Sequence, residues 1–323
     1  MRRVLVAGAS GYTGALAARI LHRHPHFELT AVTSRSDAGR RLDALYPHHR
    51  VPLVLEELDL DRHAEQADAA IVAYPHGASA VAVAQLRERG LAVVDLSADF
   101  RLRDLATYER WYVEHPHPEL LEEAVYGLPE AGYRDALRET RLAAGPGCFP
   151  TAAILALRPV AEALGDVIVD AKTGVSGAGR AATATTHYVA VDENVKAYGV
   201  GAHRHTPEIE QELGRPVLFT PHLLPLDQGE LVTCYARCDD PAEVAAVLRE
   251  AYRDEPFVEV VDGPPGVRDV RETNVCRLSV HAHEAYGRIQ VLAAIDNLWK
   301  GSSSQAVQCL NLMAGRPEGE GLW

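Results

Sequence analysis

Apolar residues in the first third of the chain fall into short continuous runs separated by amphipathic stretches. The runs predict buried strands at 2–7, 28–33, 69–74 and 91–96, because strands covered on both faces are apolar throughout. The segments between them predict helices, one after a glycine-rich turn at 8–14 and one at 79–89. Strands that alternate with helices are typical of a parallel sheet. Residues 1–147 are therefore expected to form an α/β domain of the Rossmann type with a mostly parallel sheet.

The pattern changes after residue 147, where strands follow one another with few helices between them. One helix has a clear start, because Asp240 can cap it, Pro241 takes its first position and Glu243 can reach back. The last helix is expected to begin near Ser302. Residues 148–299 are therefore predicted to form an α+β domain with a mixed or antiparallel sheet, with strands at 166–172, 217–220, 230–237, 257–261, 276–282 and 288–295.

Composition and charge narrow the classes of function. The 323 residues include 32 Lys and Arg against 45 Asp and Glu, which gives a formal net charge of −13. This charge argues against a protein that coats nucleic acid or an anionic membrane, but it allows one local basic pocket. No cleavable signal and no membrane-spanning apolar run is apparent, and the five cysteines do not resemble a disulfide framework or a zinc site. We expect a cytoplasmic protein without a metal and without a nucleic-acid or membrane partner.

The segment GASGYTG at 8–14 lies between a predicted strand and a predicted helix. Glycines at such a junction let the backbone approach a pyrophosphate, which then rests on the N-terminus of the helix. The spacing is GxxGxxG instead of the usual GxGxxG, and a purely structural turn is the alternative interpretation. We predict a dinucleotide site whose contacts come from Gly8, Ser10, Gly11, Tyr12, Thr13 and Gly14.

Ser34, Arg35 and Ser36 follow the second predicted strand. An NAD site normally has an acidic residue at this point, which holds the ribose 2′-hydroxyl. Here the three side chains could hold a 2′-phosphate instead, so the sequence favours NADP(H) over NAD(H). The alternative is that Arg35 is only a solvated loop residue.

Cys148 lies between the glycine-rich segment 145–147 and an apolar helical run at 152–157. The positive end of a helix dipole can turn such a thiol into a nucleophilic thiolate, although a small buried structural cysteine is the alternative. His203 and His205 bracket an arginine before a short predicted helix. Histidine is the natural proton donor and acceptor for a nucleophilic cysteine. Zinc binding by the two histidines is a competing interpretation that lacks an obvious third ligand.

Two further segments suit an anionic substrate, and each ends in an arginine, Arg101 in SADFR and Arg180 in SGAGR. Arginine is the preferred planar partner of phosphate and carboxylate groups. The alternative for each is a structural ion pair.

The motifs and their order resemble the N-acetyl-gamma-glutamyl-phosphate reductases, relatives of aspartate-semialdehyde dehydrogenase. The resemblance covers essentially the whole chain and is most specific in GCFPT and HRHTPEI; its other parts are GASGYTG, DLSADFR, YGLPE, SGAGR, FTPHLLP and DNLWKGSSSQAVQ. It implies an NADPH-dependent enzyme of arginine biosynthesis that reduces a small-molecule acyl phosphate to a semialdehyde. It also implies a homodimer or homotetramer, with 148–299 as the catalytic and oligomerisation domain and 300–323 as a helix packing back on the nucleotide-binding domain.

The resemblance implies roles for individual residues. Cys148 would be the nucleophile and His203 the general acid/base, with His205 as the second choice for that role. Substrate contacts would come from Arg101, Arg180, His205 and Glu208, and further cofactor contacts from Ser176, Gly177 and Asn297, with Lys300 and Gly301 close to the cofactor.

One departure from the family and three alternatives stay open. Gln228-Gly229 stands where relatives usually have Arg-Gly, which leaves any role of that arginine in doubt. A related reductase acts on an aminoadipyl phosphate held on a carrier protein, in lysine biosynthesis, but GCFPT and SGAGR favour the arginine pathway. The alternatives from other classes are an NADP-sensing regulator without catalysis and a zinc-dependent hydrolase.

Overall fold

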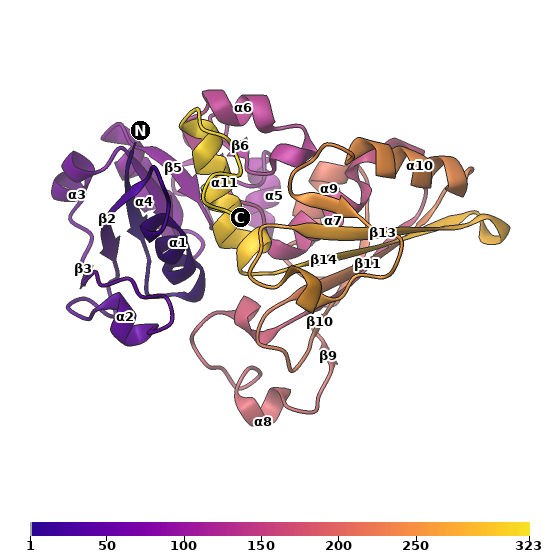
Figure 1. The fold of residues 1–323 in the computed structure, drawn as a ribbon, viewed down its shortest axis with the longest axis horizontal. Helices are drawn as coiled ribbons and strands as arrows, with labels where there is room; N and C mark the ends of the chain where they lie inside the picture. Colours follow the sequence, from indigo (N-terminus) through magenta and orange to yellow (C-terminus); the bar gives the residue numbers. More distant parts are fainter. Residues whose placement is uncertain (1) are drawn as a thin grey trace. The chain divides into compact units, whose positions relative to one another are not determined.

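The computed structural model describes residues 2–323 and divides the chain into two compact units (Figure 1). The first unit contains the chain up to Pro146 together with Ser302–Trp323, and the second contains Gly147–Gly301. The C-terminal segment thus belongs to the same unit as the N-terminal strands.

The first unit is built on a sheet of seven strands in the order β3-β2-β1-β4-β5-β7-β6. Every neighbouring pair in it is parallel. This arrangement confirms the predicted Rossmann-type domain. The strands are β1 (Arg3–Ala7), β2 (Glu28–Thr33), β3 (Leu55–Glu56), β4 (Ala69–Val72), β5 (Ala92–Asp95), β6 (Val125–Tyr126) and β7 (Leu142–Ala144).

Helices complete this unit, and its C-terminal helix is buried along its whole length. That helix, α11, packs against α1, α6 and β5. Ser303, just before it, donates a hydrogen bond to the carbonyl of Thr13 at 2.8 Å, so α11 supports the turn that begins α1. The α-helices are α1 (Tyr12–His22), α2 (Leu42–Leu45), α3 (Leu60–Gln66), α4 (Ala78–Glu88), α5 (Leu105–Trp111), α6 (Arg134–Glu139) and α11 (Ser304–Met313). Two 3₁₀ helices, η1 (Pro118–Leu120) and η2 (Pro129–Ala131), lie in its loops.

The second unit contains a mixed sheet in the order β12-β13-β14-β11-β8-β10-β9. Its centre, β13-β14-β11-β8, is antiparallel, whereas β8 pairs with β10 and β12 with β13 in parallel. The predicted α+β domain with a mixed sheet is thereby confirmed. The strands are β8 (Val167–Thr173), β9 (Lys196–Ala197), β10 (Leu218–Leu223), β11 (Glu230–Arg237), β12 (Val258–Val260), β13 (Cys276–His283) and β14 (Arg288–Ile295).

The central helix of this unit, α7 (Cys148–Leu157), packs on β11, β14 and α9. It begins four residues before the apolar run that predicted it, because Pro150 lies in the first turn, where a missing N–H costs nothing. The chain between β8 and β9 leaves the sheet as a long loop that carries α8 (Figure 1). The other helices are α8 (Tyr188–Val191), α9 (Thr206–Leu213), α10 (Pro241–Ala251) and the 3₁₀ helices η3 (Arg158–Ala163), η4 (Val175–Ala178), η5 (Val267–Val270) and η6 (Glu284–Tyr286); a π-helix, η7 (Trp299–Ser303), precedes α11.

The predicted cap of α10 is present: the Asp240 carboxylate accepts hydrogen bonds from the backbone N–H groups of Ala242 and Glu243 at 3.1 and 2.9 Å. Within residues 2–323, no helix is both long enough and apolar enough to cross a membrane.

Candidate active site

Two glycines at the start of α1, Gly8 in the turn and Gly14 in the helix, are required by close backbone contacts. Gly8 has a φ of +90°, and a Cβ there would lie 2.5 Å from the Ala73 carbonyl oxygen. A Cβ on Gly14 would lie 2.3 Å from the Gly8 carbonyl oxygen. Helix α1 has a glycine N-cap, Gly11, with no side-chain capping bond and no acidic residue in the first turn. The backbone N–H groups at this helix start are therefore suited to an anion such as a pyrophosphate.

The residues after β2 are gathered beside this turn. The hydroxyls of Ser10 and Ser34 lie 2.8 Å apart, and those of Ser34 and Ser36 lie 3.4 Å apart. Arg35 is exposed next to them. The sequence analysis overlooked one acidic residue, Asp37, whose carboxylate is 2.9 Å from Arg40. Since Arg40 balances that charge, the segment keeps a net positive charge from Arg35.

Tyr12 and Thr13 begin α1 and are tied into this region by other contacts. The Tyr12 ring meets that of Tyr46 edge-on at 6.2 Å, and the Tyr46 hydroxyl donates to the Ser10 carbonyl at 2.8 Å. All the residues predicted to bind the dinucleotide in the first unit thus lie in one turn and the loop beside it.

Cys148 is the first residue of α7 and is half-buried. Its N-cap is Gly147, with no side-chain capping bond and no acidic residue in the first turn. The fit around it is tight: a Cβ on Gly301 would lie 2.8 Å from the Cys148 Cβ, and a Cβ on Gly147 would lie 2.5 Å from Nε2 of His205. The Gly147 N–H donates to the buried Glu208 carboxylate at 2.9 Å. The loop that presents the thiol is therefore fixed by His205 and Glu208 of the HRHTPEI segment.

His203 lies in an aromatic environment in the same unit. Its ring centroid is 5.2 Å from Phe219, 5.4 Å from Tyr198 and 5.7 Å from Phe149, the residue after Cys148. Burial, with a smaller contribution from the Arg204 charge, lowers the pKa of His203 to about 4. Its Nδ1 accepts the backbone N–H of His205 at 3.1 Å. The ring is therefore neutral near pH 7, and its single proton is on Nε2.

Two side chains beside Cys148 were missed by the sequence analysis. Glu230, the first residue of β11, is fully buried, and its carboxyl group lies close to the Cys148 thiol and the Thr173 hydroxyl. Tyr198 lies close enough to Cys148 and Glu230 for their negative charges to raise the pKa of its phenol. Neither belongs to a motif, and only the pairing of β11 with β8 brings Glu230 to this edge of the sheet.

Three residues predicted to contact the cofactor from the second unit form one cluster. Asn297 accepts the Gly229 N–H at 2.7 Å and donates to the Ser176 hydroxyl at 3.1 Å. A Cβ on Gly177 would lie 3.6 Å from the Asn297 amide nitrogen. The turn before β11 and the loop after β8 are thereby held together through Asn297.

The two predicted anion-binding arginines differ in their surroundings. Arg101 is buried, and its guanidinium donates to the carbonyls of Gly145 at 2.7 Å and Leu96 at 2.9 Å. It therefore joins the chain segments that follow β5 and β7. Arg180 is exposed on the loop after η4.

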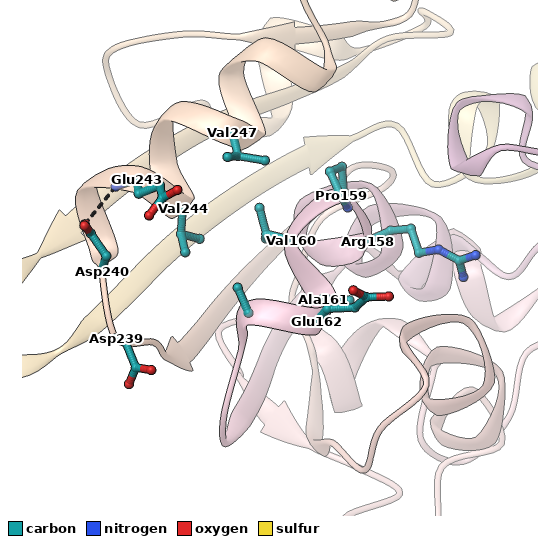
Figure 2. A pocket seen from close by; sticks show the side chains of 11 residues that line it. Arg158, Pro159, Val160, Ala161, Glu162, Asp239, Asp240, Glu243, Val244 and Val247 are labelled. Atoms are coloured by element: carbon teal, nitrogen blue, oxygen red, sulfur yellow. Dashed lines mark hydrogen bonds between the residues drawn. The ribbon is translucent and has the colours of Figure 1, made fainter.

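A separate surface pocket of about 440 Å³ lies between η3 and α10 (Figure 2). None of the predicted site residues lines it. Its charged side chains are one arginine, Arg158, against four carboxylates, those of Glu162, Asp239, Asp240 and Glu243. This excess of negative charge is the opposite of what an acyl phosphate requires. Among residues 2–323, no group of three or more His, Cys, Asp or Glu side chains is arranged to hold a metal ion.

The two parts of the chain match the two domains of one enzyme class. Residues 3–140 match the NAD-binding domain of the semialdehyde dehydrogenases, and residues 148–297 match their dimerisation domain. Aspartate semialdehyde dehydrogenase II from Vibrio cholerae, complexed with ASA, is 18% identical with a TM-score of 0.72, over 98% of each chain. The enzyme from Candida albicans with NADP is 15% identical with a TM-score of 0.72, over 97% of this chain and 98% of that one. These two structures share the fold, and the domain matches define an oxidoreductase of the semialdehyde dehydrogenase class.

More similar relatives narrow the assignment within this class. The N-acetyl-gamma-glutamyl-phosphate reductase of Desulforudis audaxviator is 49% identical over 100% of this chain and 98% of its own. That of Pelotomaculum thermopropionicum is 48% identical over 99% and 97%. The chain therefore belongs to the family of N-acetyl-gamma-glutamyl-phosphate reductases, which confirms the resemblance seen in its motifs.

Proposed function

We propose that this enzyme reduces N-acetyl-gamma-glutamyl phosphate to N-acetylglutamate 5-semialdehyde and phosphate with NADPH, as a step of arginine biosynthesis. The observation that carries the proposal is the position of Cys148 at the uncapped N-terminus of α7, on a loop fixed by Glu208 and His205. A reaction that passes through a thioester needs a thiol in this setting.

The first unit fits a dinucleotide with a 2′-phosphate. Gly8 and Gly14 lie so close to backbone atoms that neither position can carry a side chain, as expected for a tight dinucleotide-binding turn. Ser10, Ser34 and the exposed Arg35 are suited to the extra phosphate, and Asp37 is balanced by Arg40. When bound, the nicotinamide supplies the hydride.

Cys148 supplies the covalent step. Its sulfur forms a bond to the acyl carbon, and the bond from that carbon to the phosphate oxygen breaks, so that inorganic phosphate leaves and a thioester remains. Backbone N–H groups in the first turn of α7, near Phe149, are suited to the negative charge on the carbonyl oxygen. After reduction, the sulfur leaves again as the aldehyde forms.

We assign the acid/base role to His203. In the resting state its Nε2–H can donate a hydrogen bond to a developing oxyanion, since Nδ1 is already occupied by the His205 N–H. An anionic phosphate close to the ring would raise the pKa of His203 from about 4 toward the pH of the cell, and so favour the protonated ring. After reduction, the ring can give this proton to the oxygen of the hemithioacetal on Cys148 and take it back as the C–S bond breaks and the aldehyde forms.

The other residues predicted to contact substrate or cofactor differ in the roles that their surroundings support. Arg180 is the stronger candidate for the substrate anion, because it is exposed on a loop, whereas Arg101 is buried. Glu208 and His205 support Gly147 and act as positioning residues. Asn297, with Ser176 and Gly177, holds the turn before β11 for the cofactor.

We also propose that copies of the chain associate as a homodimer or homotetramer, through the part that matches a dimerisation domain, 148–297.

The test is phosphate-dependent reduction of NADP⁺ by N-acetylglutamate 5-semialdehyde, measured beside the homologue that is one carbon longer. The proposal expects the shorter aldehyde to be preferred and the rate to depend on phosphate. A clear preference for the longer aldehyde would move the enzyme to the aminoadipyl substrate of lysine biosynthesis.

A further inference from the structure

Glu230 carries a completely buried carboxyl group. It lies at the start of the central strand β11, at the end of the sheet that is close to Cys148. It is paired with Thr173, the last residue of β8, and with Ile295, the last residue of β14. A Cβ on Gly301 would approach both Cys148 and Ile295, at 2.8 and 3.3 Å. Two independent features of the fold, the strand pairing and the close contact at Gly301, thus place the carboxyl and the thiol at the same edge.

The surroundings keep this carboxyl uncharged. Burial raises the pKa of Glu230 to about 8, and Asp296 adds to the rise, although the nearby Cys148 thiol and Thr173 hydroxyl oppose it. Within residues 2–323, neither oxygen of Glu230 makes a hydrogen bond of good geometry. A buried carboxylate without a compensating partner is costly. Glu230 is therefore a carboxylic acid near neutral pH, with one O–H group to donate.

We propose that the uncharged carboxyl group of Glu230 donates a hydrogen bond to the sulfur of Cys148 when the thiol ionises, and so stabilises the attacking thiolate. The inference rests on the proposed role of Cys148 as nucleophile and adds a positioning residue to it. The proton of Glu230 stays on its own oxygen throughout. The thiol proton goes to solvent, since Cys148 is only half-buried.

Other titratable groups around Glu230 and Cys148 determine how ionisation of Glu230 should affect the thiolate. Tyr198, from the segment after β9, has a pKa raised by burial and by the charges of Cys148 and Glu230, so it stays a neutral phenol. Asp296, the residue after β14, has a pKa raised by burial, and it accepts the N–H groups of Glu272 and Leu298 at 2.8 and 3.0 Å. Each of these neighbours can only become negative. Ionisation of Glu230 would therefore place a like charge beside the sulfur and oppose formation of the thiolate.

The experiment measures how fast iodoacetamide alkylates Cys148 between about pH 6 and pH 9.5, by mass spectrometry of the peptide that contains it. The variants are Glu230→Gln, which keeps a neutral donor at every pH, and Glu230→Leu, which has none. Glu212→Gln is the matched control, because Glu212 is a buried glutamate of the same unit that pairs with Arg158. Cys148→Ser gives the background from the other cysteines, which are buried.

At about pH 9, Glu230 of the natural chain is ionised. Cys148 of Glu230→Gln should then be alkylated about three to ten times faster than Cys148 of the natural chain, because the negative charge of Glu230 would raise the pKa of the thiol by about one unit. At about pH 7, Glu230→Gln should stay within about threefold of the natural chain, whereas Glu230→Leu should be about tenfold slower for lack of the donor. Glu212→Gln should follow the natural chain throughout.

Curves for Glu230→Gln and the natural chain that coincide over the whole pH range would overturn the proposal, and so would a Glu230→Leu variant as reactive as the natural chain at about pH 7. If Glu230→Leu does not fold, the curve of Glu230→Gln decides alone. The alkylation rate needs no substrate or cofactor, so it is independent of the proposed function. The proposed role of Cys148 as nucleophile would fail separately, if Cys148→Ser kept its turnover.

Discussion

Helices α1 and α7 begin in nearly the same way, yet they prepare different chemistry. Each has a glycine N-cap in extended conformation, Gly11 with φ −78° and ψ 165° and Gly147 with φ −69° and ψ 156°. Neither helix has a side-chain cap or an acidic residue in its first turn. Both N-termini are therefore suited to negative charge.

The difference lies in what surrounds each helix start. Around α1, Gly8 and Gly14 lie so close to backbone atoms that neither position can carry a side chain. Such a tight turn is typical of the site that binds the pyrophosphate of a dinucleotide. At α7 the first residue is a cysteine, and side chains from two other segments lie beside it and Gly147: His205 and Glu208 of the HRHTPEI segment, and Glu230 of β11. The same kind of helix start is thus suited to a bound ligand in one unit and to the proposed thiolate in the other, and long-range contacts decide between the two.

The largest effect is expected when the thiol is removed. Cys148→Ser should lower reductase turnover below detection, because a hydroxyl at this position is far less ionised than a thiol. NADPH affinity, measured by fluorescence titration, should change by less than about twofold, since the predicted dinucleotide contacts of the first unit are untouched. Normal turnover in this variant would rule out a covalent mechanism through Cys148.

His203→Asn should lower turnover by about 10²–10⁴-fold, the usual contribution of acid–base catalysis. His205→Asn is the matched variant, and it should act through the position of Gly147, with a smaller loss that includes lower thermal stability. Steady-state kinetics and a melting curve for both variants separate the two roles. A larger loss of turnover for His205→Asn, with its stability unchanged, would reverse the assignment.

The buried carboxyl of Glu230 should also make folding stability depend on pH. Its pKa is about 8 in the folded chain, above the ordinary value of 4.5. The stability it contributes is therefore complete below about pH 4.5 and is lost as the pH rises through about 8, at about 1.4 kcal/mol per pH unit. Glu230→Gln should remove this slope, which urea unfolding at several pH values measures. An unchanged slope would mean that Glu230 is ionised in the folded chain.

The sequence predicts the long strands of both units, but it does not predict the residues that reach the candidate site only through contacts distant in the sequence. The predicted ranges 28–33, 230–237 and 288–295 coincide with β2, β11 and β14, because these strands are six to eight residues long and rich in apolar residues. The two-residue strands β3, β6 and β9 are too short to show a period. Cys148 and His203 stand in motifs and can be found there, whereas Glu230 and Tyr198 become site residues only through strand pairing and loop packing.

Substituting one glycine at each helix start tests the comparison directly. Gly147→Ala keeps an allowed backbone but places a Cβ 2.5 Å from the His205 ring, so turnover should fall by about tenfold or more while NADPH still binds. Gly14→Ala places a Cβ 2.3 Å from the Gly8 carbonyl and should weaken NADPH binding while Cys148 stays reactive to iodoacetamide. Equal effects of both variants on both measurements would remove the distinction between the two helix starts.

The smallest expected effect concerns the choice of cofactor. Arg35→Ala should weaken NADPH about tenfold, because a charge-assisted contact at an exposed site contributes about 1.5 kcal/mol. NADH binding should change little, since it has no 2′-phosphate. Isothermal titration with both nucleotides makes the comparison, and equal losses would mean that Arg35 does not contact that phosphate.

The central claim is that the acyl group is carried on the sulfur of Cys148. The most direct measurement is the intact mass of the enzyme after incubation with N-acetylglutamate 5-semialdehyde and NADP⁺ in the absence of phosphate, followed by peptide mapping. The account predicts one N-acetylglutamyl group on Cys148, which disappears when phosphate is added. An unmodified Cys148 in an enzyme that still forms NADPH, or an acyl group on a different residue, would contradict it.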